Sequence, residues 1–224
     1  MNVGILLAAG NSTRFGSPKQ LTYIGDKMII EHSLETLSEL DKVIIVTNPK
    51  CYETISKIRF QVNPSSSSLL SPRELGSPRN VILISEGTRE DSIKKGLKFL
   101  WNTGWNINKV IVHDAARPFV TKSQVALLLQ GEFYSQFVLK LTNGLAIMSN
   151  GKAEPLDRNK YFELCTPVMI SFELACKYLS GQYFEFLDIL NEQGINYSLH
   201  MGCYRELRKI TYPSDLEISN FINK

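Results

Sequence analysis

Two cations flank a small-residue turn near the start of the chain. The stretch AAGNSTRFGSPKQ follows an apolar run and carries Arg14 and Lys19. Small residues let a backbone approach a ligand closely, and a turn after a strand aims amide groups at it. Arg14 offers a planar fork of donors for phosphate oxygens, and Lys19 a compact charge that can neutralise an anion in a transition state. These residues indicate a phosphate-holding loop, while a solvated basic turn is the alternative.

The turn matches neither of the two common phosphate-loop patterns. It lacks the spacing GxxxxGK[ST] and the spacing GxGxxG. A kinase-type loop and a dinucleotide site are therefore disfavoured.

A carboxylate ends a second apolar run, in VIVHDAARP at residues 110–118. Asp114 is expected at the carboxyl end of a parallel strand, where open α/β sheets place their ligands. A carboxylate beside bound phosphates is a natural Mg²⁺ ligand, because this cation takes oxygen donors and bridges to phosphates. The alternative is a capping Asp114 beside a surface Arg117.

A third group lies in EGTREDS at residues 86–92. Thr88 and Ser92 begin a predicted helix there, so their hydroxyls and amides could meet a base or a ribose. Simple helix capping explains the same residues, and spacing alone favours it.

The elements that would position these groups alternate along the chain. Short, nearly continuous apolar runs predict buried parallel strands at 3–9, 42–47, 80–85 and 109–114. Apolar residues three and four apart predict helices at 29–40, 91–101 and 121–132. The pattern predicts one α/β domain over residues 1–224, with a mostly parallel sheet flanked by helices. The Ser- and Pro-rich segment 63–80 is expected to be a long surface loop.

The pattern changes after about residue 134. Asn143-Gly144 and Asn150-Gly151 are both favoured hairpin corners, which predicts a projecting β-arm at about 136–157. Such an arm commonly finds a partner, so we expect a homodimer. Helices are predicted at 172–179 and 182–194, a strand at 196–202 and a last helix from about 213.

Composition limits the partners. The 25 Lys and Arg against 22 Asp and Glu give a net charge of +3, which does not suggest a nucleic-acid or membrane surface. No stretch approaches a membrane span or a signal peptide, so a cytoplasmic protein is expected. The cysteines lack metal-ligand or redox spacing and are expected to be reduced packing residues. They are Cys51, Cys165, Cys176 and Cys203.

Five motifs in order resemble one known family. LLAAGNSTRFGSPKQ, EGTREDSIKKGL, VIVHDAARPFVT, LDRNKYFELCTP and RKITYPSDLEIS are similar to segments of the 2-C-methyl-D-erythritol 4-phosphate cytidylyltransferases (IspD). The resemblance covers nearly the whole chain, and HDAARP with the DS-x-x-x-GL helix is its most specific part. It implies a Rossmann-like nucleotidyltransferase fold, a homodimer formed through β-arms, Mg²⁺ dependence, and transfer of CMP from CTP to a sugar-alcohol phosphate with release of pyrophosphate.

The resemblance also implies roles for individual residues. Arg14 and Lys19 would hold the triphosphate, Lys209 would reach the α-phosphate from the other side, and Asp114 would hold Mg²⁺. The base and nucleotide would lie against Ala8, Ala9, Gly10, Gly87, Thr88, Ser92 and Ala115. The acceptor would meet Arg158 and Thr166, with Arg117 contributed across the dimer. No covalent nucleophile is needed, so His32, His113 and His200 need no catalytic role.

The departures from the family gather in the acceptor half. Val168 and Leu207 replace polar residues, and the arm lacks a recognisable Asp-Thr step. The opening loop is also two residues shorter between Arg14 and Lys19, as in the molybdopterin cytidylyltransferases. Three hypotheses remain: the methylerythritol enzyme, a relative that activates another polyol phosphate such as ribitol 5-phosphate, and a weakly active nucleotide-binding homologue.

Overall fold

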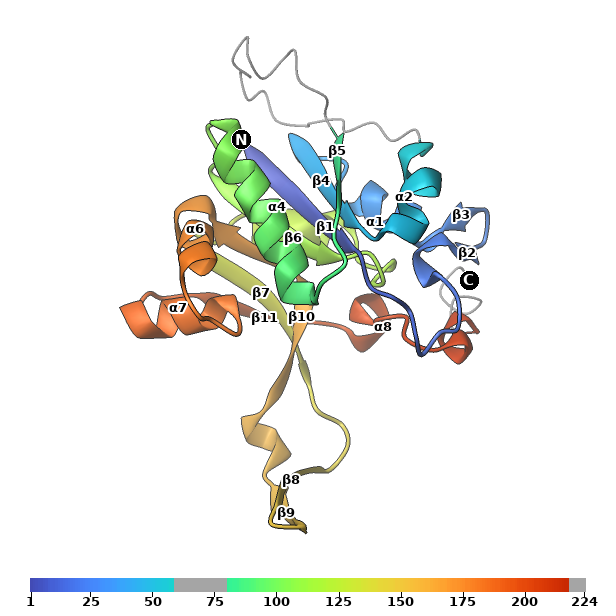
Figure 1. Cartoon of the computed structure of the whole chain (residues 1–224). Coiled ribbons are helices and arrows are strands. Elements are labelled where there is room, and N and C mark those ends of the chain that lie inside the picture. The colour runs from blue at the N-terminus through green and yellow to red at the C-terminus, as the bar shows by residue number, and fades with distance from the viewer. Residues whose placement is uncertain (59–79, 218–224) are drawn as a thin grey trace.

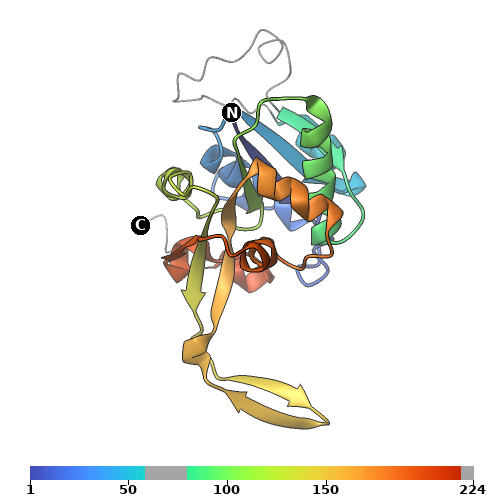
Figure 2. The ribbon, with the colours of Figure 1, turned by 90° about the vertical axis from the view of Figure 1, so that its left-hand side faces the viewer.

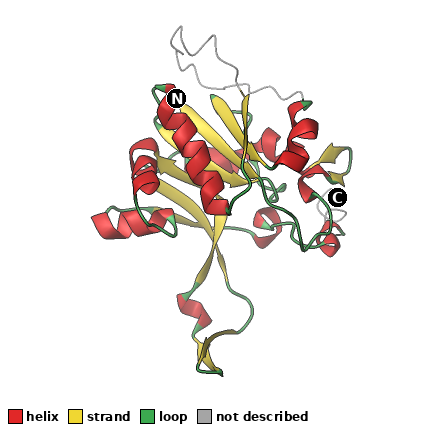
Figure 3. Cartoon of the chain, in the orientation of Figure 1, coloured by secondary structure: helices red, strands yellow, loops and turns green. Residues whose placement is uncertain are grey.

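A seven-stranded sheet forms the centre of the computed structural model (Figures 1 and 3). The structure describes residues 1–58 and 80–217. The strands lie in the order β11-β7-β10-β6-β1-β4-β5. The first half of the sheet comprises β1 (Asn2–Ala8), β4 (Lys42–Thr47), β5 (Asn80–Ile84) and β6 (Lys109–Asp114), all parallel. These strands match the four predicted apolar runs within one residue, and β1, β4 and β6 are almost fully buried, whereas β5 at the edge of the sheet is half-buried.

The second half of the sheet contains one antiparallel strand. It comprises β7 (Tyr134–Lys140), β10 (Phe162–Ser171) and β11 (Ser198–Met201). Only β10 runs against its neighbours β6 and β7, while β11 is parallel to β7. The sheet is therefore mainly parallel and flanked by helices, which confirms the α/β fold class. The sequence analysis did not predict β10 as a strand.

Helices cover both faces of the sheet, as α5 and α6 show in Figure 2. One layer holds α4 (Arg89–Thr103), α6 (Phe172–Ser180) and α7 (Phe186–Gln193), and the other α1 (Ile29–Thr36), α2 (Pro49–Ser56) and α5 (Lys122–Leu128). Successive side chains of a strand point to opposite faces. In β1, Ile5 and Leu7 accordingly join the α4 layer, whereas Leu6 and Ala8 join the α1 layer.

Gly96 lets α4 lie close to the sheet. A Cβ atom at this position would stand 2.9 Å from Cγ2 of Ile5 in β1, nearer than such atoms normally approach. Thr88 caps the helix start by accepting the N–H of Asp91, and Gly104 ends the helix with a φ of 65°. The cap and the close packing fix the first turn of α4 at the edge of the sheet.

A two-stranded ribbon projects from the body of the molecule (Figures 1 and 2). It pairs β8 (Leu145–Ser149) with β9 (Lys152–Leu156) through a turn in which Asn150 and Gly151 have φ of 49° and 76°. That turn agrees with the hairpin corner expected there. The corner expected at Asn143-Gly144 is wrong, because β7 pairs with β10 and β11 and not with β8. Residues 136–140, expected in the arm, belong to the central sheet.

Several predicted boundaries shift at helix ends. The helix expected at 29–40 ends at Thr36. Beyond it, backbone hydrogen bonds between residues three positions apart form tighter turns up to Leu40. The helix expected at 121–132 is α5, and the last helix is a 3-10 turn, η3 (Pro213–Leu216). The other short elements are η1 (Lys19–Leu21), β2 (Tyr23–Ile24), β3 (Lys27–Met28), η2 (Arg158–Lys160) and α8 (Tyr204–Leu207). Of the expected loop 63–80, residues 63–79 lie outside the described residues.

The four cysteines are free thiols. Cys51 and Cys165 are buried, as expected of packing residues, whereas Cys176 is half-buried and Cys203 is exposed. Within residues 1–58 and 80–217, no helix is long and apolar enough to cross a membrane.

Candidate active site

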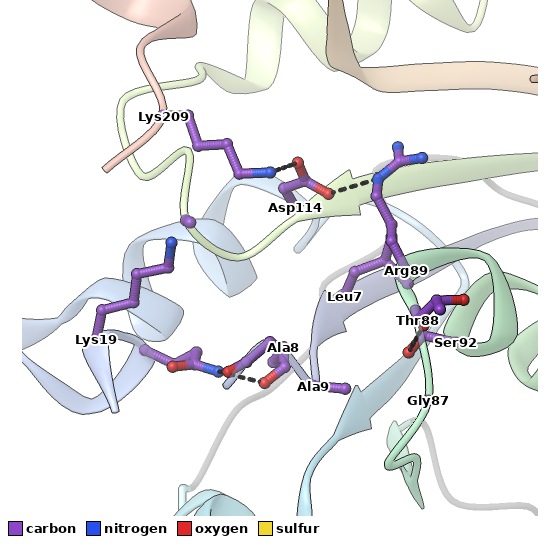
Figure 4. Close-up of a pocket in the computed structure, with 13 residues that line it drawn as sticks. Leu7, Ala8, Ala9, Lys19, Gly87, Thr88, Arg89, Ser92, Asp114 and Lys209 are labelled. Atoms are coloured by element: carbon purple, nitrogen blue, oxygen red, sulfur yellow. Dashed lines mark hydrogen bonds and ion pairs between the residues drawn. The ribbon is translucent and has the colours of Figure 1, made fainter. Parts of the chain in front are cut away.

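A cavity of about 140 Å³ opens at the carboxyl ends of β1 and β6, the edge where parallel sheets place ligands (Figure 4). Nine residues assigned to the site from the sequence line it. They are Ala8, Ala9, Gly10, Lys19, Gly87, Thr88, Ser92, Asp114 and Lys209. The first cavity therefore unites the opening loop, the start of α4, the end of β6 and the RKIT segment.

Lys19 enters the first cavity from the opening loop. Its Nζ donates to the carbonyl oxygen of Ile210 at 2.9 Å, which joins the loop to the RKIT segment. Burial, reinforced by the charge of Lys209, lowers the pKa of Lys19 to about 8. A partly desolvated ammonium has few solvent partners to lose when it binds an anion. Lys19 is therefore suited to hold phosphate oxygens.

Arg14 lies apart from Lys19, although five positions separate them in the sequence. Its guanidinium carbon is 5.7 Å from the ring centroid of Tyr212, a cation–π contact. Arg14 lines a second cavity of about 320 Å³ and not the first. The two cations that the sequence analysis assigned together to the triphosphate thus line adjoining cavities, and the charge of Arg14 contributes to the lowered pKa of Lys19.

Asp114 lies among three cations at the end of β6. Its Oδ2 accepts from Nζ of Lys209 at 2.8 Å, and its Oδ1 accepts from Nε of Arg89 at 3.4 Å. Nε of Arg117 is 4.0 Å from Oδ2. Burial would raise the pKa of Asp114, but these charges outweigh burial and hold the pKa well below its usual range. The group is therefore a carboxylate at any pH at which the protein works.

Asp114 meets part of the requirement for magnesium. It is the only carboxylate among the described residues that line the first cavity, and no described cluster of three acidic, His or Cys side chains could hold a metal. Mg²⁺ is commonly held by one or two carboxylates together with substrate phosphates. The donor set therefore fits a magnesium–nucleotide complex in which Asp114 takes the place of one water. It does not fit an ion held by the protein alone.

Three residues that the sequence analysis assigned to the nucleotide lie at the start of α4 and line the first cavity. They are Gly87, Thr88 and Ser92. Oγ1 of Thr88 accepts the N–H of Asp91 at 3.1 Å, and Oγ of Ser92 donates to the Thr88 carbonyl at 3.0 Å. A Cβ atom on Gly87 would stand 2.4 Å from Oδ2 of Asp91, which the cap requires in its present place. This turn can both cap α4 and contact a ligand, because the capped turn forms one wall of the first cavity. Ala115 is fully buried and outside the lining, where its neighbour Ala116 lies instead.

The second cavity is strongly basic. Cationic side chains of Arg14, Arg117, Arg208 and Lys209 line it together with one carboxylate, Glu163. Lys209 lines both cavities, so the two join at this side chain. A group bound in the second cavity would meet the nucleotide at the Nζ of Lys209.

The predicted acceptor residues occupy three different environments. Arg117 is 5% exposed, donates to the Leu207 carbonyl and faces Glu163 at 3.6 Å within its own chain, and its expected contribution across a dimer stays a prediction. Thr166 is buried and accepts the backbone N–H of Asp114 at 3.1 Å, so it positions that carboxylate. Arg158 lies in η2 at the base of the arm, where it donates to the Thr142 carbonyl, and it lines neither cavity.

The residues that depart from the family pattern have structural roles. Val168 is buried in the core layer beneath α4 and α6. Leu207 is fully buried, and its carbonyl holds the guanidinium of Arg117.

Sequence reasoning missed two side chains that line the first cavity. Arg89 bridges Asp114 and Glu185, and Gln20 bonds the backbone of the opening loop. Both belong to motifs quoted above, EGTREDS and SPKQ, so their presence was visible in the sequence. Their contacts were not, because Arg89 pairs with residues 25 and 96 positions away.

The model of one protein family matches residues 3–224, namely IspD, 2-C-methyl-D-erythritol 4-phosphate cytidylyltransferase. The chain belongs to the IspD family. A curated IspD relative from Thermotoga neapolitana is 28% identical over all of this chain and 97% of its own length. One from Chlamydia pneumoniae is 29% identical over 96% of this chain and 95% of its own length.

Solved structures support the same fold. The chain is similar to a 4-diphosphocytidyl-2C-methyl-D-erythritol synthase from Anaerococcus prevotii, with a TM-score of 0.71, 19% identity, and 100% and 96% of the two chains covered. It also matches the bifunctional IspDF of Campylobacter jejuni with a TM-score of 0.71 and 22% identity, over 97% of this chain and 53% of the other. The IspD-family resemblance seen in the sequence is thus confirmed.

Proposed function

We propose that the protein transfers CMP from CTP to 2-C-methyl-D-erythritol 4-phosphate and releases pyrophosphate. The observation that carries the proposal is that the first cavity, formed by the opening loop and the start of α4, joins a strongly basic cavity at Lys209. Two phosphate-bearing substrates must approach each other, and a cation between them offsets their repulsion. Membership of the IspD family and the names of its relatives support this pair of substrates.

The reaction requires little acid–base chemistry. An oxygen of the acceptor phosphate attacks the α-phosphorus of CTP, a new P–O bond forms, and the bond to the β-phosphate oxygen breaks. The acceptor phosphate is already ionised at neutral pH, so no general base has to remove a proton. The task of the protein is to align the two anions and to stabilise the charge that gathers on the α-phosphorus.

The cationic side chains divide this task. Lys19 holds the phosphates of CTP from the opening loop, and Lys209 contacts the α-phosphate and the acceptor phosphate at the junction. Arg14 and Arg117, which face the second cavity, attract the acceptor phosphate. Asp114 would hold Mg²⁺, which neutralises part of the triphosphate charge when bound. Thr166 and Arg89 keep the Asp114 carboxylate in place.

The protein also forms a homodimer in this proposal. The β8–β9 ribbon exposes Ile147 and Met148 to 52% and 67%, so both apolar side chains are free to pack against a partner subunit. Arg158, at the base of the ribbon, would reach the acceptor site of the partner subunit. A cytoplasmic location follows from the use of CTP and a small polyol phosphate.

A substrate panel tests the proposal. Purified protein with Mg²⁺ is mixed with each of four nucleoside triphosphates and with methylerythritol phosphate or ribitol 5-phosphate, and pyrophosphate is measured. We expect turnover with CTP and methylerythritol phosphate. Turnover with CTP and ribitol 5-phosphate, but not with methylerythritol phosphate, would show that ribitol 5-phosphate is the acceptor. CTP binding without turnover would favour a nucleotide-binding module.

A further inference from the structure

Two buried side-chain amides bond to the carbonyls behind the opening loop. Gln20 is 2% exposed, and its Nε2 donates to the carbonyl oxygen of Ala8 at 2.5 Å and of Gly10 at 2.9 Å. Asn48 is 5% exposed, and its Nδ2 lies 3.4 Å from the carbonyls of Ala9 and Gly10. Three consecutive carbonyls are thus bonded from the protein side of the loop.

The orientation of each amide follows from its other contacts. Oδ1 of Asn48 accepts the N–H of Cys51 at 3.0 Å and caps α2, so Nδ2 must face the loop. Oε1 of Gln20 accepts the Ser12 hydroxyl at 3.1 Å. The reverse orientation of Gln20 would place its oxygen against two carbonyl oxygens, which repel it.

The same contacts extend to Lys19. Oγ of Ser12, held by Gln20, accepts the backbone N–H of Lys19 at 3.3 Å. Ser12 has a φ of 55°, a conformation that non-glycine residues adopt only when neighbours hold it. Gln20 therefore links the loop backbone to the residue that carries the catalytic ammonium.

The front of the loop has the opposite character. In the described part of the chain, the backbone N–H groups of residues 10–14 have no acceptor. Successive free N–H groups form a concave site of partial positive charge that binds anions. Because the carbonyls are engaged behind the loop, the N–H groups are left to face a ligand.

We propose that Gln20 and Asn48 are positioning residues for nucleotide binding. By holding the carbonyls of residues 8–10, they fix the backbone that faces the base and turn the amides of residues 10–14 toward the triphosphate. Without these donors the carbonyls would lie buried and unpaired, and the loop would rotate to satisfy them. The inference rests on the proposed function for the identity of the nucleotide.

Two substitutions separate positioning from folding. Gln20→Met keeps the side-chain length and removes both donors. Asn48→Asp keeps the oxygen that caps α2 and replaces the donor to the loop by a negatively charged oxygen that faces the carbonyls of Ala9 and Gly10. Gln193→Met, at the exposed end of α7, is the matched control because its amide contacts only Lys177 among the described residues.

The affinities for CTP and UTP are measured by calorimetry without an acceptor, beside kcat, KM and the thermal midpoint. We expect CTP affinity to fall about tenfold in Gln20→Met and about threefold in Asn48→Asp, since the bonds of Asn48 are longer. The preference for CTP over UTP should fall in both, because the base-facing backbone moves. KM for CTP should rise more than kcat falls, and Gln193→Met should match the unchanged chain.

Unchanged CTP affinity and base preference in both variants would overturn the proposal. Lower thermal midpoints with unchanged affinity would show a structural role only, which also overturns it. If Gln20→Met does not fold, Asn48→Asp decides the matter. Because binding is measured without an acceptor, these results stand even if the proposed transfer to methylerythritol phosphate fails.

Discussion

The two cavities that meet at Lys209 are built in different ways. The first is lined mainly by backbone and small side chains, with Lys19, Arg89, Asp114 and Lys209 at its polar end. The second is lined by long cationic side chains around one carboxylate and has more than twice the volume. Backbone walls fix the shape of a ligand, whereas flexible cations require mainly its charge. The nucleotide side is therefore the more selective half within one protomer.

Removing Lys19, on the nucleotide side, should lower turnover more than any other substitution. We expect Lys19→Ala to lower kcat by about 10³-fold, because a cation at the reacting phosphates is worth several kcal/mol in the transition state. The thermal midpoint should change little. Lys27→Ala, an exposed lysine paired with Glu35, is the control. Steady-state pyrophosphate release checks the prediction, and turnover within threefold of normal would remove Lys19 from the mechanism.

Neutralising Asp114 should have the next largest effect. Asp114→Asn leaves Lys209, Arg89 and Arg117 without their shared partner and removes the expected magnesium ligand. We expect kcat to fall about 10²-fold and the magnesium concentration for half-maximal rate to rise. Titration of the rate with Mg²⁺ measures both values, with the exposed Asp26→Asn as control. An unchanged magnesium dependence would show that the ion does not depend on Asp114.

The pH profile should sharpen the role of Lys19. With a pKa of about 8, the Lys19 amine is mostly protonated at pH 7 in the protein without ligand. Its positive charge is lost as the pH rises through 8. We expect kcat/KM for CTP to fall about tenfold per pH unit above that value. Lys19→Arg should abolish this alkaline limb, since an arginine stays charged. An identical limb in the two proteins would assign it to another group. Asp114, whose pKa lies well below its usual range, should add no acid limb near neutrality.

Arg158 should give the smallest effect and tests the acceptor side. It lies outside both cavities of its own protomer, so its expected role depends on a partner subunit. We expect Arg158→Ala to raise the KM for the acceptor about tenfold and to leave the KM for CTP unchanged. Lys160→Ala, on the same 3-10 turn, is the control. If both KM values stay constant, the acceptor does not reach the arm.

The nucleotide side was also the part that the sequence predicted best. Strand ends, caps and small-residue turns are local features, so Ala8, Thr88 and Asp114 were placed where parallel strands end. The sequence analysis assigned Ala115 to the nucleotide site, whereas Ala116 lines the first cavity. Beyond the end of a strand, the direction of each side chain depends on the turn that follows. The separation of Arg14 from Lys19 had no local signal, since it depends on Tyr212 and Ile210 near the other end of the chain.

The acceptor side depends on contacts that sequence spacing does not report. The Leu207 carbonyl and Glu163 hold Arg117 within one chain, and its expected role across a dimer stays a prediction. Strand β10, which brings Thr166 beside Asp114, was not predicted because Pro167 interrupts an apolar run. Long-range pairing between β6, β10 and α8 decides these positions.

The central claim is that Lys209 serves both substrates, and Lys209→Met tests it most directly. The variant keeps the length of the side chain and removes its charge. With kcat and both KM values measured by pyrophosphate release, we predict a fall in kcat of about 10²-fold and a rise in the KM values for CTP and for the acceptor. A change in only one KM, with kcat preserved, would contradict the claim that the two cavities work through one shared cation.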